Sequence, residues 1–218
     1  MQISKETIEI LKNFATINGN ILIRKGNVLS TISTAKNIFA KAKVQEDFPV
    51  EVPIYDLNSL LALLTLMENQ TISFGDKSLT IQKDGGKFEY FYSNPSVIVA
   101  APDKNIELDN HFQFKLSSED INLITKAAAI TSAPTISVSC KHQQVVLGIG
   151  DRKNDTANTY KKTIGPGIED FDCHISVDNF RVINDAYNVT ISKKKFMHFK
   201  SETKNIEYFI AMEPDSVV

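Results

Sequence analysis

The chain has few cysteines and no long apolar run. Only two of its 218 residues are cysteines, Cys140 and Cys173, which does not suggest a secreted disulfide scaffold. The longest apolar run, LLALLTLM at residues 60–67, is too short to span a bilayer. The first residues, MQISKETIEI, lack the basic segment and apolar stretch of a signal peptide. These absences predict a cytoplasmic protein without a membrane-spanning segment.

An excess of basic charge is also missing. The chain has 24 Lys and Arg against 26 Asp and Glu, a net charge of −2 at pH 7. Hydrophobic residues make up 42% and charged residues 23%, as in ordinary folded proteins. A polycation is therefore excluded, and any contact with nucleic acid must come from a local basic surface.

The sequence patterns of common enzyme sites are absent as well. There is no G-x-x-x-x-G-K-[ST], G-x-G-x-x-G, H-E-x-x-H or G-x-S-x-G. The acidic pairs at residues 119–120 and 169–170 are typical of a helix start and a loop. An enzyme of unknown chemistry on a duplicated α+β fold remains an alternative, because a site can be assembled from scattered residues.

A metal site is not indicated by the few cysteines and histidines. Cys140 and His142 would share one face of a strand, whereas Cys173 and His174 would point to opposite faces. No C-x-x-C pair is present. We expect two buried cysteines, no metal and no cofactor.

What the sequence does contain is a repeated pattern. NQTISF begins at Asn69 and NVTISK at Asn188, 119 residues apart, and EYF follows each of them, at residues 89–91 and 207–209. Chance is the alternative, because Thr-Ile-Ser also occurs at residues 31–33 and 135–137. The predicted elements follow the same order around both repeats, and this favours an internal duplication over chance.

The first half reads as helix, strands, helix and meander. Ser4 can cap the helix SKETIEILKNFATIN, although Thr7 is a poor reciprocal partner for a capping box. Strands NILIR, VLSTIS, NIFAKAKV and FPVEVPIY follow, and Asp56 can cap a second helix, LNSLLALLTLM. TISFG, LTIQK and KFEYFY then predict a three-stranded meander.

The second half repeats this order. It has a helix LSSEDINLITKAAAIT, strands TISVSCK and QVVLGIG, a loop-rich stretch at residues 151–170, and a strand FDCHIS. VDNFRVINDAY is predicted as the second helix of this half, followed by another meander. A boundary falls within residues 94–111, where prolines and polar residues separate the halves. Two α+β layers are therefore expected.

Basic residues follow the predicted helices. The polar face of the first helix carries Lys5, Glu9, Lys12 and Thr16. Lys126 lies on the third helix and Arg181 on the predicted fourth. Solvated helix faces explain the same pattern, and Arg181 has Asp178 and Asp185 within pairing distance on that helix.

Four segments carry a resemblance to a known family. LKNFATIN (residues 11–18), IYDLN (54–58), VIVAAP (97–102) and AMEPDS (211–216) resemble the DNA polymerase sliding clamp of T-even-type bacteriophages. The duplicated layout is similar to proliferating cell nuclear antigen (PCNA), the cellular clamp of the same fold. The resemblance implies two tandem clamp domains, residues 1–104 and 111–218, with a connector near residues 95–110.

The resemblance also implies a function. A homotrimeric ring, with helices on its inner face and antiparallel sheets outside, would encircle double-stranded DNA and tether the replicative DNA polymerase, without catalysis. Strands near residues 88–92 and 158–164 would join neighbouring subunits. A clamp-loader complex would be a partner, viral DNA replication and late transcription the processes, and the host bacterial cytoplasm the location. A processivity factor that binds DNA without encircling it is the alternative.

The resemblance assigns residues to two sites. Those facing DNA would be Lys5, Lys12, Lys126 and Arg181, although the second helix has no basic residue. A pocket for partner peptides would include Ile38, Ile106, Leu108, Phe209, Ala211, Met212 and Pro214. Phe209 and Ala211 are equally well explained as core residues. Because Pro214 cannot donate to a strand ladder, the chain should leave the sheet next to Met212.

Overall fold

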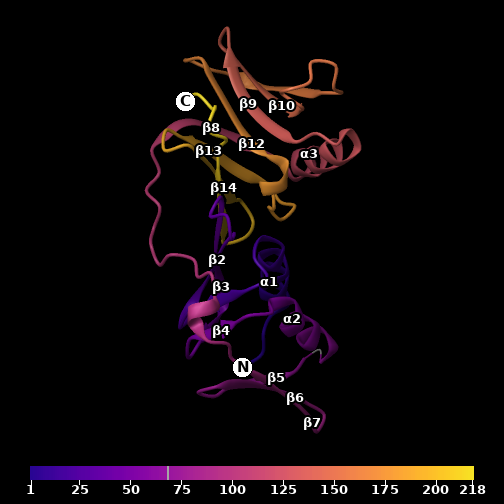
Figure 1. The fold of residues 1–218 in the computed structure, drawn as a ribbon, viewed down its shortest axis with the longest axis vertical. Coiled ribbons are helices and arrows are strands. Elements are labelled where there is room, and N and C mark those ends of the chain that lie inside the picture. The colour runs from indigo at the N-terminus through magenta and orange to yellow at the C-terminus, as the bar shows by residue number, and fades with distance from the viewer. Residues whose placement is uncertain (68) are drawn as a thin grey trace. The chain divides into compact units, whose positions relative to one another are not determined.

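The chain divides into two compact units, Met1–Lys104 and Asn105–Val218 (Figure 1). The computed structural model describes residues 1–67 and 69–218. No helix within these described ranges has the length and apolarity needed to cross a membrane.

The first unit contains both predicted helices and the predicted meander. Its elements are α1 (Lys5–Ile17), β1 (Ile21–Ile23), β2 (Gly26–Ile32), β3 (Ile38–Phe48), β4 (Val52–Ile54), α2 (Leu57–Leu66), β5 (Thr71–Phe74), β6 (Ser78–Lys83), β7 (Gly86–Phe91) and the 3-10 helix η1 (Pro95–Val97). Antiparallel ladders join β1 to β4, β2 to β3, and β5 to β6 to β7. Helix α1 packs against α2, β2 and β3 (Figure 1).

The start of α1 is closed by a residue from a distant strand. Ser4 accepts a hydrogen bond from the Thr7 amide, as predicted. The reciprocal bond comes from Glu46 of β3, whose carboxylate accepts from the Ser4 amide and from the Thr7 hydroxyl, both at 2.5 Å. A carboxylate at a helix N-terminus also complements the helix dipole. Glu46 therefore replaces the missing half of the capping box.

The second unit holds one α-helix and two four-stranded antiparallel sheets. Its elements are β8 (Asn110–Leu116), α3 (Ser118–Thr131), β9 (Thr135–Lys141), β10 (Gln144–Gly150), β11 (Tyr160–Pro166), β12 (Phe171–Ser176), the 3-10 helix η2 (Val177–Asn179), β13 (Tyr187–Ser192), β14 (Phe196–Ser201) and β15 (Ile206–Ala211). One sheet has the order β11-β10-β9-β12, and the other runs β8-β13-β14-β15. The capping box of α3, Ser117 with Asp120, is complete.

The helix predicted for residues 177–187 is wrong. Only η2 forms, and an irregular segment leads from it into β13. Side chains satisfy this backbone: the Tyr187 hydroxyl donates to the Ile183 carbonyl at 2.7 Å, and the Tyr208 hydroxyl accepts from the Ile183 amide at 3.3 Å. Asp185 accepts from Ser201 and Thr203. The segment is also rich in β-branched, Asn and Asp residues, which are weak helix formers.

Two strands were not expected from the residue pattern alone. The stretch at 151–170 was predicted to be rich in loops, but it contains β11, and β8 begins at Asn110, within the boundary region. Strand β11 has a mostly exposed, lysine-containing sequence, YKKTIGP, and forms the end of its sheet. Such an edge strand carries little of the apolar alternation by which buried strands are recognised.

The repeated words occupy the same places in the two meanders. TIS lies in β5 and in β13, and EYF lies in the third strand of each meander, β7 and β15. Their burial differs. Phe91 of β7 is 68% exposed, whereas Phe209 of β15 is 7% exposed, packed by Phe196 and by the ring of His198. Strand β7 therefore presents an aromatic surface that its counterpart buries.

Candidate nucleic-acid interface

The polar face of α1 brings two of the candidate DNA-facing residues together. Lys5 and Lys12 are both exposed, and both line one groove of about 450 Å³ whose other wall includes Leu64 and Thr65 of α2. Glu9 also lines this groove and offsets part of the positive charge. The Ser4–Glu46 cap fixes the turn that carries Lys5.

Helix α2 adds no positive charge to this surface. Its exposed residues include Ala62, Thr65 and Leu66, the last 72% exposed. With Lys12 they line a second depression of about 650 Å³. The helical surface of the first unit is therefore sparsely basic.

In the second unit the two candidate basic residues have different settings. Lys126 is exposed on α3, on the same helix face as Leu123 and Ile130, which is 84% exposed. Arg181 lies in the irregular segment after η2, and its Nε donates to the Asp178 carbonyl at 2.8 Å. The expected placement of Arg181 on a helix is therefore wrong.

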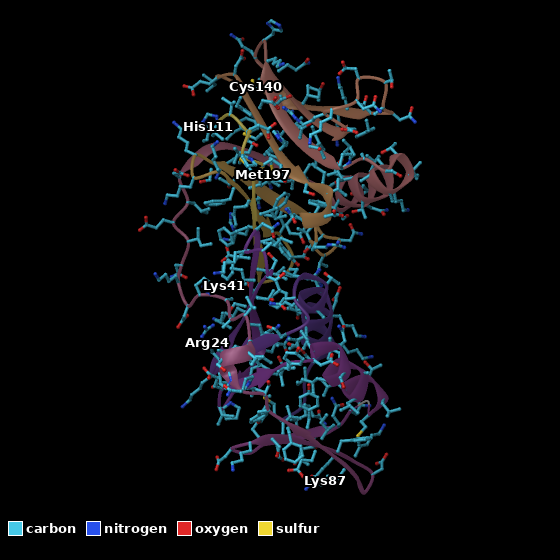
Figure 2. The ribbon with its side chains drawn as sticks, viewed as in Figure 1. Arg24, Lys41, Lys87, His111, Cys140 and Met197 are labelled. Atoms are coloured by element: carbon cyan, nitrogen blue, oxygen red, sulfur yellow. The ribbon has the colours of Figure 1, made fainter. Side chains whose placement is uncertain are left out.

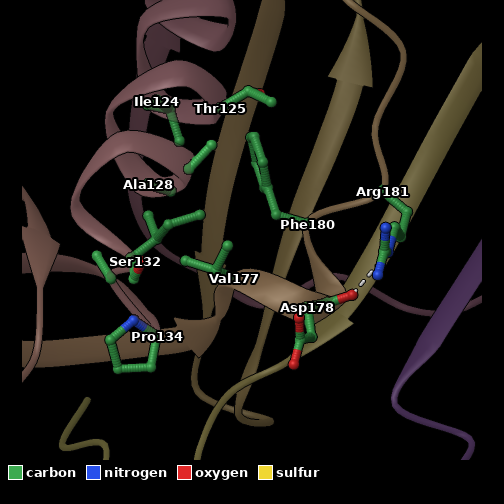
Figure 3. A pocket seen from close by; sticks show the side chains of 12 residues that line it. Ile124, Thr125, Ala128, Ser132, Pro134, Val177, Asp178, Phe180 and Arg181 are labelled. Carbon is green, nitrogen blue, oxygen red and sulfur yellow. Dashed lines mark hydrogen bonds between the residues drawn. The ribbon is translucent and has the colours of Figure 1, made fainter.

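A cavity of about 480 Å³ lies between α3 and the segment that carries Arg181 (Figure 3). Its wall is mainly apolar, with Ile124 and Ala128 from α3 facing Val177 and Phe180. Arg181 lines this cavity, but Lys126 does not. The fold thus does not gather these two cations into one pocket.

The cysteines and histidines are set apart from this surface. Cys140 and Cys173 are fully buried on neighbouring strands (Figure 2 labels Cys140), and burial raises the pKa of the Cys173 thiol to about 12. His142 is exposed in the turn after β9. Among the residues that the structure describes, no three such side chains are grouped to hold a metal ion.

The candidate residues for partner peptides are distributed over both units. Ile38 is buried in β3 of the first unit. In the second unit Phe209 and Met212 are buried, Ile106 and Ala211 are half-buried, and Leu108 and Pro214 are exposed. Strand β15 ends at Ala211, where the chain was expected to leave the sheet.

Sequence reasoning missed where the chain goes after Met212. Residues 213–217, here called the tail, run along the outer edge of β12. The Glu213 amide donates to the His174 carbonyl at 2.9 Å, and Val217 forms two backbone bonds of 2.9 Å with Asp172. The ring of His174, 2% exposed, lies between the side chains of Asp215 and Ser216. The polar residues on either side of Pro214, which are Glu213, Asp215 and Ser216, do not by themselves indicate this contact.

Comparisons with known proteins agree with this architecture. Residues 4–100 match the family model of the DNA polymerase processivity factor. Over 98% of this chain and 99% of the relative, the sequence is 30% identical to the sliding clamp of Vibrio phage KVP40. The chain belongs to the sliding-clamp family. The clamp is also 27% identical to the sliding clamp of Enterobacteria phage T4, over 99% of this chain and 98% of the relative.

A solved structure shares the fold of the clamp. The PCNA2–PCNA3 complex of Sulfolobus tokodaii contains a chain that matches with a TM-score of 0.68 and 11% identity, covering 97% of the clamp and 98% of that chain. The predicted α+β fold with tandem clamp domains and the predicted family are thereby confirmed. The clamp is a DNA polymerase processivity factor, and its curated relatives are phage proteins.

Proposed function

We propose that the clamp closes into a head-to-tail homotrimer around double-stranded DNA and tethers the replicative polymerase, without catalytic activity of its own. The observation that carries this proposal is the match of nearly the whole chain, at 30% identity, to a sliding clamp. Because its relatives come from phages, the clamp would act in the host bacterial cytoplasm, where a clamp-loader complex would open and place it.

Two edge strands support closure by a second copy. Strand β7 ends the meander of the first unit, and β11 ends one sheet of the second unit. In β7 the side chains of Phe88 and Phe91 are 41% and 68% exposed, whereas Phe209, at the place of Phe91 in the other meander, is 7% exposed. Lys161 and Thr163 of β11 are exposed. Pairing β7 of one subunit with β11 of the next is a heterologous contact, which closes into a ring when the rotation fits.

The basic residues support a contact with DNA that ignores sequence. Lys5, Lys12, Lys126 and Arg181 are exposed and would face the duplex. Contacts to phosphate carry no sequence information, so a sparse set of long cations can centre the duplex without holding it at one register. Retention then depends on the closed ring rather than on affinity.

A surface of the second unit supports docking of partners. This surface has apolar residues, some of them exposed: Ile106 and Leu108 from the connector, Ala211 at the end of β15, and Met212 and Pro214 just after it. We call these five residues the docking residues. They would bind a short peptide of the polymerase or the clamp loader. A few buried apolar anchors commonly dominate such contacts.

Retention on circular DNA tests the ring. The clamp is loaded by its clamp loader on a nicked circle, and release is followed at high salt before and after a restriction enzyme makes the circle linear. A closed ring stays on the circle and leaves once ends are available, and its native mass is three times 24.3 kDa. A monomeric mass, together with equal release from circle and linear DNA, would instead indicate a processivity factor that does not encircle DNA.

A further inference from the structure

The tail acts as a short extra strand on the open edge of β12. In the order β11-β10-β9-β12, β12 is an end strand, and Val217 closes two backbone hydrogen bonds with Asp172 across that edge. The His174 amide donates to the Ser216 hydroxyl at 3.1 Å, and the Cys173 thiol lies 3.4 Å from the Val217 carbonyl. The path of the chain directly after Met212 is thereby fixed.

The ring of His174 contacts the tail at both nitrogens. Nε2 lies 2.7 Å from Asp215 Oδ1, and Nδ1 lies 3.3 Å from Ser216 Oγ. The Ser216 hydroxyl is also 3.3 Å from the His174 carbonyl. A hydroxyl can donate to one acceptor while it accepts from another group. A neutral ring therefore donates at Nε2 and accepts from Ser216, and a protonated ring donates at both nitrogens while Ser216 turns to the carbonyl.

Charged groups surround this contact from each neighbouring segment. Asp215 is mostly exposed and faces His174, and the hydrogen bond from His174 holds the pKa of Asp215 below its usual range. Arg152 forms two bonds of 2.9 Å with Asp172, and it also attracts Asp215. Lys195 Nζ donates to the Pro214 carbonyl at 3.0 Å, and Glu213 contributes its amide. Asp215 supplies the carboxylate of this contact, and protonating that carboxylate would weaken it as the acceptor for His174 Nε2.

We propose that His174 is a positioning residue of the partner site: by holding Asp215 and Ser216 it fixes the tail on β12 and sets the position of Met212 and Pro214. This inference rests on the proposed docking of a partner peptide at those residues. Met212 is held from the other side, because its amide donates to the Lys195 carbonyl at 2.9 Å. Pro214 lies between the two anchors and is exposed, so the tail path decides which face it presents.

The first experiment measures the tail itself. Val217 amide exchange and methyl NMR signals are compared for the natural chain, His174→Ala, His174→Gln and Ser216→Ala. Removing both hydrogen bonds of the ring should speed Val217 exchange about ten- to a hundredfold. Glutamine retains a donor near Asp215 and should restore much of the protection. The matched control is His198→Gln, because His198 is equally buried and lies 2.9 Å from Glu207 in the same unit.

Acid titration supplies a reading that a change in packing alone does not alter. The pKa of Asp215 is lowered in the folded chain. The stabilisation of the tail by the Asp215 carboxylate is therefore present above about pH 4 and is lost as the pH falls through that lowered pKa. Val217 signals should therefore move toward the detached state in strong acid. Asp215→Asn should remove this transition. The proposal would be overturned if Val217 amide exchange in His174→Ala equalled that of the natural chain. It would also be overturned if Asp215→Asn showed the same acid transition.

The second experiment separates this proposal from the docking site. A synthetic peptide of the C-terminal residues of the phage's replicative polymerase is titrated by calorimetry into His174→Ala and into the double variant Ile106→Ser, Leu108→Ser. We expect at least about tenfold weaker binding in both. Normal binding by the double variant would overturn the docking site itself. Weak binding by the double variant but normal binding by His174→Ala, with its tail detached, would overturn the role of His174 alone.

Discussion

The start of α1 depends on a single residue 42 positions further along the chain from Ser4. Glu46 is 7% exposed, and both of its carboxylate oxygens are used by Ser4 and Thr7. Burial alone would raise the pKa of Glu46, but the bonds from Thr7 and Ser4 outweigh it and lower the pKa. The carboxylate is therefore kept ionised next to the positive end of the helix dipole.

Replacing Glu46 with Ala should destabilise the first unit. The change leaves the Ser4 amide and the Thr7 hydroxyl without their partner, so the free energy of unfolding should fall by about 1–3 kcal/mol. Urea unfolding measures this difference. Since the pKa of Glu46 is lowered on folding, its contribution should vanish as the pH falls through that lowered value.

The neighbouring variant Gln45→Ala serves as the control, because Gln45 is exposed on the same strand. Equal stability of the Glu46 and Gln45 variants would show that the cap contributes nothing. The sequence revealed the Ser4 half of this cap from local spacing. It could not reveal Glu46, because nothing in the local pattern states which strand residue will lie over the helix end.

At the scale of elements, the strength of local patterns decides which predictions hold. Helices α1, α2 and α3 carry long apolar periodicities and capping residues, and all three were predicted. The segment at 177–187 has a similar spacing of apolar residues. However, the hydroxyls of Tyr187 and Tyr208 form hydrogen bonds with the backbone carbonyl and amide of Ile183. Contacts made by the side chains of Tyr187, at the end of the segment, and Tyr208, from β15, overrode the weak helical preference there.

The same limit applies to the candidate site. The exposure of Lys5 and Lys12 follows from the polar face of α1, which the sequence contains. The setting of Arg181 follows from the irregular segment, which the sequence did not reveal. The tail on β12 was missed because a segment held by three backbone hydrogen bonds and the side chain of one histidine has no periodic pattern.

Strand β7 provides the test of assembly at this scale. Replacing Phe88 and Phe91 with Asp should leave the fold intact and abolish trimers at micromolar concentration, because charges would enter the proposed subunit contact. Native mass spectrometry and analytical ultracentrifugation measure the outcome. Tyr55→Asp is the control, since Tyr55 is 63% exposed and lies outside β7. Persistent trimers in the double Asp variant would place the contact elsewhere.

At the scale of the whole molecule, the proposed contact with DNA depends on where charge lies rather than on the total charge. The net charge of −2 would not attract DNA in bulk, whereas exposed cations on α1 and α3 can act locally. The absence of basic residues from α2 makes this surface weaker than a continuous basic stripe. Such a balance fits the proposed ring, which would be retained on DNA by closure rather than by tight binding.

Replacing Lys5, Lys12, Lys126 and Arg181 with Ala should weaken the binding of DNA while leaving assembly intact. The slope of log affinity against log salt should become shallower by roughly 0.9 for each phosphate that the variant no longer neutralises, and processive synthesis should decline. Fluorescence anisotropy at several salt concentrations and primer extension measure these effects.

The matched control removes the same charge from Lys25, Lys141, Lys153 and Lys200, which are exposed on strands and turns. If affinity and slope fall by the same amount in both quadruple variants, only the total charge matters and the assignment to the helices fails.

The edge of β12 also has a consequence for the order in which the chain is made. In the first unit, the Ile72 amide donates to the carbonyl of Met1, a residue that is synthesised long before it. In the second unit, the backbone hydrogen bonds of Asp172 with Val217 can form only after Val217 is made, 45 residues later. The first unit can thus fold while synthesis continues, but β12 stays open until the tail emerges. During that interval the nascent chain exposes a strand edge to chaperones and to other nascent chains.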